Sequence, residues 1–169
     1  MLAWDGGHTP GVTSDLDALN DLYNHYVLST PIAFDIEPVG MNSRHEWFTH
    51  YAERGRHRLI VAVDGGRLVG YTTSSPWRLE RAYETSVETS ISIAPDAIAR
   101  GIGSQLYTAL FEALASEDVH RAYAGITQPN PASVALHVRF GFALVGTFTE
   151  QGRKLGRYWD VAWYEKPLG

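Results

Sequence analysis

The sequence predicts an α/β fold built as a single alternating unit. Segments with apolar residues at helical spacing alternate along the chain with short runs rich in β-branched residues. No internal repeat, low-complexity tract or Pro/Gly/Ser-rich linker divides the chain, and 169 residues is an ordinary length for one domain. With 44% hydrophobic residues, the composition is that of a protein with a packed core. We therefore expect one domain that spans residues 1–169.

Two helices are predicted near the N-terminus. A serine and an aspartate at the start of an apolar pattern with helical spacing predict a first helix over about 15–28. Ser43 and Glu46 have the spacing of a capping box and predict a second helix, whose apolar pattern stops at Gly55. No strand is expected before the first helix, because residues 8–12 are the only candidate and a poor one.

The middle of the chain is predicted to form three strands. Residues 58–75 contain two β-rich runs on either side of Asp64, Gly65 and Gly66. These turn residues tolerate positive φ, so the segment is expected to form a hairpin. Residues 86–94 continue as a third strand.

The remaining chain is predicted to alternate helix and strand. Leucines and aromatic residues from 106 to 114 form one wide apolar face, so a helix that begins at about Gly103 is expected to pack on the sheet. The segments that follow are predicted as a strand (119–127), a short helix that stops at Gly141 (130–140) and two closing strands (142–150 and 157–166).

The composition excludes several classes of function. The chain has no cysteine, which excludes disulfides, zinc ribbons and thiol nucleophiles. A net charge of −5 argues against nucleic acid, which requires a basic face, and no apolar run is long enough to span a bilayer. His45 and His50 are five residues apart, so they cannot share one helix face as metal ligands. We expect a cytoplasmic protein without a nucleic-acid, membrane or metal partner.

A glycine pair, Gly101 and Gly103, stands between the third strand and the long helix. The first-turn N–H groups of a helix lack internal partners and carry the positive end of its dipole, so this position suggests an anion site. The pair is not a Walker loop, since no G-K-[ST] follows, and Leu106 stands where a dinucleotide fingerprint has its third glycine. By itself the stretch is equally compatible with a helix cap that binds nothing.

The surrounding sequence adds a family resemblance. Residues 88–142, with "ETSISIAPDAIARGIGSQLYTALFEAL" and "ITQPNPASVALHVRFGF", resemble the acetyl-CoA site of the GNAT acetyltransferase superfamily. Within it, "YNHYVLSTPIAFDIEP", "SPWRLERAYETSVE" and "GRYWDVAWYEK" look like the phosphinothricin and methionine-sulfone N-acetyltransferases, and this likeness runs from about Leu16 to Lys166. The resemblance implies a GNAT fold, with a mixed central β-sheet flanked by helices on both faces. It also implies acetyl-CoA as cosubstrate, direct attack of a free amine on the thioester, no metal, and a homodimer.

The resemblance implies a set of acetyl-CoA contacts. Backbone N–H groups of the glycine loop would hold the pyrophosphate, the strand before it would meet the pantetheine by main-chain hydrogen bonds, and the start of the next helix would contact the cofactor arm. Ile98 and Ala99 depart from the superfamily pattern, in which Gln or Arg and then Gly are usual, so phosphate binding would rest more on the backbone. The implied residues are Ile91, Ser92, Ile93, Ala99, Arg100, Gly101, Ile102, Gly103, Ser104, Asn130 and Ser133.

The same resemblance assigns the catalytic groups. Glu88 matches the family's base position near the start of the strand that faces the thioester, and His137 stands where the superfamily commonly has a Tyr that protonates the thiolate. Strand alternation alone favours a solvent-facing Glu88 on a half-exposed strand, and the match to the family's base position reverses that interpretation. We expect Phe34, Tyr83 and Trp159 to enclose Glu88 and raise its pKa by desolvation, as a general base requires.

The acceptor site is expected in the segment "SPWRLERAY". Arg78, Arg81 and Tyr83 lie there, and a guanidinium suits the carboxylate of a free amino acid. Glu80 stands where relatives usually have a second basic residue, which argues against an acceptor with a second acidic group, and Trp159 stands where a His is frequent. Two alternatives remain open: a protein N-terminal or polyamine acetyltransferase, and a catalytically silent acyl-CoA-binding sensor.

Overall fold

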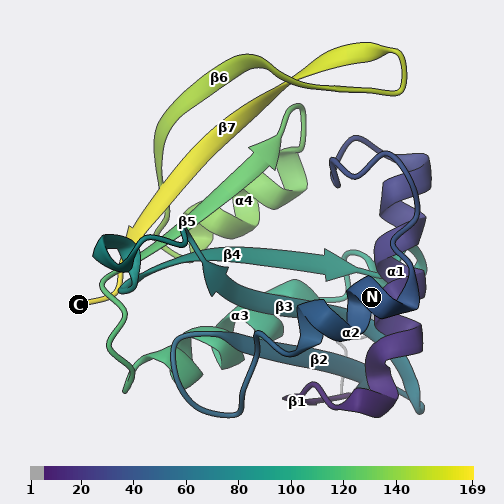
Figure 1. The fold of residues 1–169 in the computed structure, drawn as a ribbon, viewed down its shortest axis with the longest axis vertical. Coiled ribbons are helices and arrows are strands. Elements are labelled where there is room, and N and C mark those ends of the chain that lie inside the picture. Colours follow the sequence, from purple (N-terminus) through teal and green to yellow (C-terminus); the bar gives the residue numbers. More distant parts are fainter. Residues whose placement is uncertain (1–5) are drawn as a thin grey trace.

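The computed structural model describes residues 6–169, in which seven strands, four α-helices and three 3₁₀ turns are formed (Figure 1). Every predicted helix and strand is present, with ends that differ by a few residues. In chain order the elements are β1 (Gly7–Pro10), α1 (Leu16–Ser29), α2 (Met41–Phe48), β2 (Arg58–Asp64), β3 (Arg67–Pro76), β4 (Ser86–Ile93), α3 (Ile102–Leu114), β5 (Arg121–Thr127), α4 (Pro131–Arg139), β6 (Ala143–Lys154) and β7 (Arg157–Pro167). The 3₁₀ turns cover Thr13–Asp15, Arg81–Tyr83 and Pro95–Ala97.

The strands form one mixed sheet in the order β1-β2-β3-β4-β5-β7-β6. All neighbours in it are antiparallel except β4 and β5, which run parallel. The predicted hairpin of β2 and β3 is confirmed, and both glycines of its turn, Gly65 and Gly66, have positive φ. A parallel pair needs a crossover, and here α3 supplies it.

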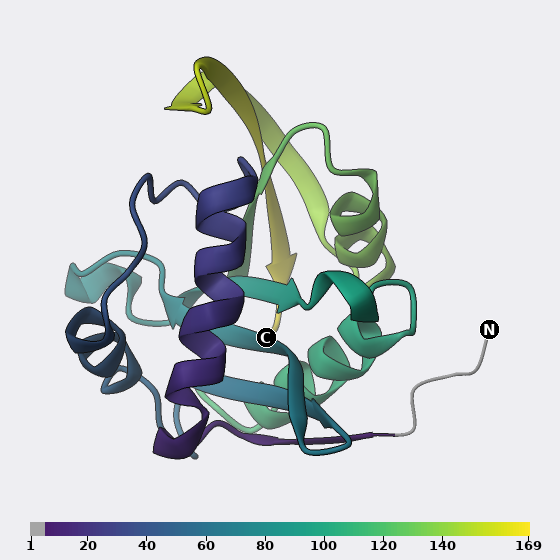
Figure 2. The same ribbon diagram turned by 90° about the vertical axis from the view of Figure 1, so that its right-hand side faces the viewer.

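Helices cover both faces of the sheet (Figure 2). On β3, a Cβ placed on Gly70 would lie 3.3 Å from the side chain of Leu106 in α3, whereas the ring of Tyr71 lies 6.3 Å from that of Trp47 in α2. Because successive side chains on a strand point to opposite faces, α2 and α3 lie on opposite sides of the sheet. The predicted fold class, a mixed sheet with helices on both faces, is confirmed.

The apolar core packs α3 against the sheet and also includes the buried face of α1, with Leu16 and Leu19. Leu106, Tyr107 and Leu110 of α3 and Val69 and Val87 of the sheet are fully buried. Such a wide apolar face on a helix of 13 residues is what the spacing of its leucines predicted. Within residues 6–169, no helix is long and apolar enough to cross a membrane.

Two predictions for the N-terminal part are wrong. A strand does precede the first helix, because Gly7–Pro10 pairs antiparallel with β2. This strand is exposed and has one neighbour, so its sequence carries no hydrophobic alternation, and a proline is tolerated at such an edge. The second helix spans Met41–Phe48 with Gly40 at its N-cap, so Ser43 lies inside the helix and Gly55 lies well beyond its end.

The parallel pair of β4 and β5 opens like a fork. Only Ser86, Val87 and Glu88 pair with β5. Beyond them the two strands separate, and the Thr89 hydroxyl donates to the Tyr123 carbonyl at 3.2 Å just past the last pair (Figure 1). The rest of β4 therefore has one unpaired edge in the middle of the sheet.

Candidate active site

A cavity of about 630 Å³ lies at the fork. Its wall is formed by α1, α2, β3, β4, β5, α4, β6, β7 and the segments on either side of α2. Seven of the residues singled out in the sequence line it: Phe34, Glu88, Ile91, Ser92, Asn130, Ser133 and His137. Tertiary structure thus brings together residues that are up to about a hundred positions apart in the chain.

Glu88 lies in the wall of this cavity. It pairs with Ser75 on β3 in the same register that pairs Ser92 with Tyr71, so its side chain shares a face with Tyr71, which contacts α2. Burial raises the pKa of the Glu88 carboxyl above its usual value, and the charge of Arg78 opposes that shift. A carboxyl with a raised pKa inside a cavity is suited to general-base chemistry.

Beside Glu88 the sheet carries an aromatic cluster that the sequence did not suggest. Trp77, Tyr123 and Trp163 form a cluster, with ring centroids 4.5 Å apart for Trp77 and Tyr123 and 5.0 Å apart for Trp77 and Trp163. Tyr123 is the register partner of Glu88 on β5, and Trp163 lines the cavity. A Cβ on Gly125 would come within 3.0 Å of the Trp163 ring, so the glycine makes room for the tryptophan.

Of the predicted aromatic enclosure, only Phe34 lines the cavity. Tyr83 is 45% exposed, in the turn after β3. The indole N–H of Trp159 donates to the Lys154 carbonyl at 2.9 Å, and its ring lies 3.6 Å from the guanidinium carbon of Arg157. Tyr83 and Trp159 therefore do not line the cavity, whereas Trp163, which the sheet register places there, does.

The unpaired edge of β4 exposes backbone groups to the fork. Ala94 donates its N–H to the Val69 carbonyl on β3. In an antiparallel pair, every second residue exchanges backbone hydrogen bonds with the neighbouring strand, so Ser92, Ser90 and Glu88 also turn their backbone groups toward β3. Thr89, Ile91 and Ile93 therefore turn their backbone groups toward β5. The Tyr26 hydroxyl already donates to the Ile93 carbonyl, which leaves Ile91 and the Ile93 N–H for another strand-like partner.

The glycine loop places free N–H groups at the start of α3. Gly101 is the N-cap residue in the left-handed conformation, with φ of 85°, and a Cβ there would meet nothing within 4 Å. Within residues 6–169, no backbone carbonyl accepts from the N–H groups of Gly101, Ile102 or Gly103. Gly103 has a different use, since a Cβ would lie 3.2 Å from Leu136 of α4. Ala99, at the position where relatives have glycine, also has positive φ.

The basic residues near this loop differ from the expectation. Arg100 forms an ion pair with Asp64 at 2.8 Å, so its guanidinium faces the β2–β3 turn. Arg139, which the sequence gave no reason to single out, reaches the first turn of α3, with its Nη1 3.4 Å from the Ser104 hydroxyl. Arg139 lies 35 residues after Ser104 in the chain, so only the packing of α4 against α3 reveals this contact.

The start of α4 borders the same cavity. Asn130 is the N-cap residue, and its Oδ1 accepts from the Ser133 N–H at 3.2 Å. Its amide NH₂ remains available, since the cap uses only the oxygen. Pro131 fits the first helical position, which has no need of an N–H partner.

His137 is buried and belongs to a hydrogen-bond network. Its Nδ1 lies 2.8 Å from the Ser133 carbonyl and its Nε2 lies 2.7 Å from the hydroxyl of Tyr107. Because a carbonyl can only accept, Nδ1 carries the proton and Nε2 accepts from Tyr107. Burial lowers the pKa of His137 and raises that of Tyr107, so both are uncharged at neutral pH. The sequence did not point to Tyr107, which its spacing marked only as a core residue.

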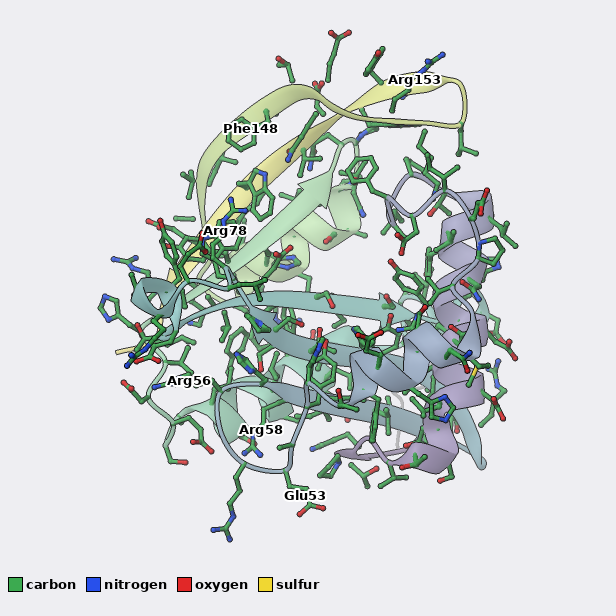
Figure 3. The ribbon with its side chains drawn as sticks, viewed as in Figure 1. Glu53, Arg56, Arg58, Arg78, Phe148 and Arg153 are labelled. Carbon is green, nitrogen blue, oxygen red and sulfur yellow. The ribbon has the colours of Figure 1, made fainter. Side chains whose placement is uncertain are left out.

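The predicted acceptor residues lie outside the cavity wall. Arg78, Arg81 and Tyr83 are exposed, and the Arg78 guanidinium carbon lies 4.9 Å from the centroid of Trp77. Figure 3 shows Arg78 at the closed end of the fork, near the start of β4. Its positive charge acts on Glu88 and partly opposes the rise in the pKa of Glu88 that burial causes. Within residues 6–169, no group of three or more His, Asp or Glu side chains is placed to hold a metal ion.

The sheet forks beside the N-terminus of α3, and a carboxyl lies in the wall of the cavity at the fork. The family model described as "Acetyltransferase (GNAT) family" matches residues 19–142. The chain belongs to the GNAT acetyltransferase family.

Individual relatives agree with this assignment. The chain is 60% identical to a phosphinothricin N-acetyltransferase of Streptomyces coelicolor, over 94% of both chains. It is 31% identical to an L-methionine sulfoximine/L-methionine sulfone acetyltransferase of Pseudomonas aeruginosa, over 92% of this chain and 90% of that protein. The crystal structure of a phosphinothricin acetyltransferase from Sinorhizobium meliloti in complex with AcCoA superimposes with a TM-score of 0.92 at 30% identity, covering 98% of this chain and 90% of the other.

Proposed function

We propose that the protein transfers the acetyl group of acetyl-CoA to the α-amine of a free amino acid or amino-acid analogue. The observation that carries this proposal is the position of Glu88, a carboxyl with a raised pKa in the wall of the cavity at the fork. The names of the relatives support amino-acid analogues such as phosphinothricin and methionine sulfone as acceptors.

The residues present suit acetyl-CoA as the acyl donor. Three unpaired N–H groups at the positive end of the α3 dipole, beside Arg139, fit a pyrophosphate. The free edge of β4 at Ile91 and Ile93 fits the amide groups of a pantetheine arm, and the spare NH₂ of Asn130 lies across the fork from it. When bound, acetyl-CoA would supply the thioester that the acceptor amine attacks.

The chain's own groups then handle the protons. Glu88 removes a proton from the acceptor ammonium, directly or through water, so that the neutral amine can attack the thioester carbonyl. His137 is proposed to pass a proton to the departing sulfur. Its ring is uncharged at neutral pH, with Nδ1 donating to the Ser133 carbonyl and Nε2 accepting from Tyr107, so it acts only after exchanging one of these partners and taking up a proton. The proton that Glu88 removes from the ammonium balances the one that the departing sulfur receives.

An acceptor screen tests the proposed function. The protein is incubated with acetyl-CoA and, separately, with free amino acids, methionine sulfone, phosphinothricin, a peptide with a free N-terminus and spermidine. Thiol release and product mass are measured. We expect acetylated amino acids or their analogues; preferential acetylation of the peptide or of spermidine would support the first alternative, and acetyl-CoA binding without thiol release across the panel would support a silent sensor.

We also propose that the chain is one cytoplasmic domain and forms a homodimer. The support for the dimer is β6, an edge strand that is exposed from Ala143 to Gln151 and carries Leu144, Val145 and Phe148 at 57%, 61% and 62% exposure. Unpaired edge strands are templates for pairing with another chain. Figure 3 shows Phe148 on the outer hairpin.

The expected result for Phe148→Glu is a shift from dimer to monomer, because a charge would be buried against the second copy. Light scattering during size-exclusion chromatography measures the mass. Leu28→Glu is the matched control, since Leu28 is 60% exposed on α1 and its substitution should leave the dimer intact. A wild-type monomer at micromolar concentration, or a Phe148→Glu dimer, would contradict the assignment of β6 as the interface.

A further inference from the structure

Arg44 of α2 is a buried cation in the wall of the cavity. The residue is 3% exposed. Its guanidinium carbon lies between two aromatic rings, 4.6 Å from the centroid of Tyr23 and 4.5 Å from that of Trp47. Its Nε donates to the side chain of Asn20 at 3.0 Å. These contacts fix the guanidinium plane and its direction, as a preformed binding group requires.

Arg44 forms no ion pair within the described part of the chain. Within residues 6–169, no carboxylate lies within 4.0 Å of its nitrogens. Asp35 also lines the cavity, but it is exposed and its Oδ2 accepts from the Tyr23 hydroxyl at 2.6 Å. The two terminal Nη groups of Arg44 make no hydrogen bond in this part of the chain. A cation removed from water is ordinarily paired, so an unpaired one is unusual.

The free Nη groups of Arg44 open onto the cavity. The one side-chain nitrogen in residues 6–169 that is sealed from solvent without a partner is Nε of Arg58. The Nη groups of Arg44 therefore keep some solvent contact, and because the residue is almost fully buried and lines the cavity, that contact is through the cavity. Tyr51 and Tyr71 line the same cavity, and the Tyr51 hydroxyl is hydrogen-bonded to Ser75 at 2.8 Å.

We infer that Arg44 binds an anionic group of the acceptor, a carboxylate or an equivalent oxyanion, by its two free Nη groups. This inference rests on the proposed function, since it names how the acceptor is recognised at the same site. Arg44 and Glu88 face one cavity from the same side of the sheet, so an acceptor can meet the cation with its acid and the carboxyl with its ammonium. Arg78, which the sequence suggested for this role, is exposed and outside the wall.

The same assignment changes the expectation for acceptors with two acidic groups. Glu80, which was expected to repel a second acid, is exposed and does not line the cavity. The oxyanion bound by Arg44 could be the α-carboxylate or a phosphinate at the end of the side chain. Both groups carry negatively charged oxygens that accept hydrogen bonds from a guanidinium.

Three probes separate these sources: methionine sulfone, which has only the α-carboxylate; phosphinothricin, which adds a phosphinate; and 3-(methylsulfonyl)propylamine, which lacks both. For Arg44→Met, which keeps length and apolar packing between the two rings, kcat/KM is measured with each probe. We expect a loss of about 10- to 100-fold for the acids, typical of removing hydrogen bonds to a charged group, and little change for the amine. Loss with both acids places the α-carboxylate at Arg44, and loss with phosphinothricin alone places the phosphinate there.

Equal losses with all three probes, or no loss with any, would overturn the inference. Arg58→Met is the control, since Arg58 is also largely buried but lies outside the cavity wall. Arg44→Lys keeps the charge but lacks the two parallel N–H groups of the guanidinium, so it should give an intermediate loss. This variant preserves the test if the methionine variant does not fold. If the protein shows no turnover, calorimetry without acetyl-CoA measures the Kd of each probe for the wild type and for Arg44→Met. The inference can then be tested even if the proposed function fails.

Discussion

Replacing Glu88 by glutamine is expected to lower kcat by at least about a hundredfold. A positioned general base contributes typically about 10²- to 10⁴-fold, and glutamine keeps the shape of the side chain but cannot accept a proton. Activity should recover partly at high pH, where more of the amine is already deprotonated. The measurement is kcat by thiol release over a range of pH, with acetyl-CoA and the acceptor saturating.

The stability of the same variant gives an independent readout. Burial raises the pKa of Glu88 in the folded protein above its unfolded value, so ionisation of Glu88 destabilises the fold once the pH exceeds the unfolded pKa. Glu88→Gln should therefore melt at or above the wild-type temperature at neutral pH, and the difference should vanish in acid, where both states are protonated. Exposed Glu84 provides the control, because Glu84→Gln should retain wild-type kcat. Retention of more than about a third of kcat by Glu88→Gln would remove Glu88 from the mechanism.

The second large effect is expected at the glycine loop. Acetyl-CoA at about a hundred times its Kd should stabilise the wild type by roughly 2.7 kcal/mol, which corresponds to a rise in Tm of about 5 to 10 °C. Gly101→Val should lose most of this shift, because the new side chain would project into the open space in front of the unpaired N–H groups. Thermal melts with and without acetyl-CoA measure it.

The positive φ of Gly101 makes a matched control necessary, because valine is strained there whether or not a ligand binds. Gly55 has φ of 93° and open space around its Cβ position, and it lies away from the loop, where its N–H bonds Glu117. Gly55→Val should thus lower the Tm of the free protein similarly but keep the acetyl-CoA shift. A folded Gly101→Val that shows the full shift would exclude the loop as the phosphate site.

The elements of this fold could be predicted because their signals are local. Helical spacing marked α1, α3 and α4, the Asp64-Gly65-Gly66 turn marked the hairpin, and Gly141 marked the end of α4. Each of these features depends on residues within a few positions of one another. β1 could not be found in this way, because an exposed edge strand is defined by the partner that its backbone pairs with, and its side chains need no pattern.

Some residues of the candidate site could be predicted from the sequence, and others could not. Glu88, Asn130 and the glycine loop could be singled out from the sequence because a family motif preserves their spacing on adjacent elements. Arg44 and Trp163 could not, since each reaches the site from an element outside the motif segment 88–142, and Arg139 lies within that segment but is not one of its motif positions. The predicted roles of these residues remain predictions, which the substitutions above test.

By itself, the sequence determined the order of helices and strands from α1 onward, the family, and the motif residues at the fork. Only the tertiary structure decided which side chains close the cavity around Glu88, that Arg100 pairs with Asp64 while Arg139 reaches the α3 N-terminus, and that Arg44 is buried without an ion pair among residues 6–169. The physical reason is the range of the interactions involved. Backbone propensity and periodicity act over a few residues, whereas burial, register and charge pairing depend on which distant segments the folded sheet brings side by side.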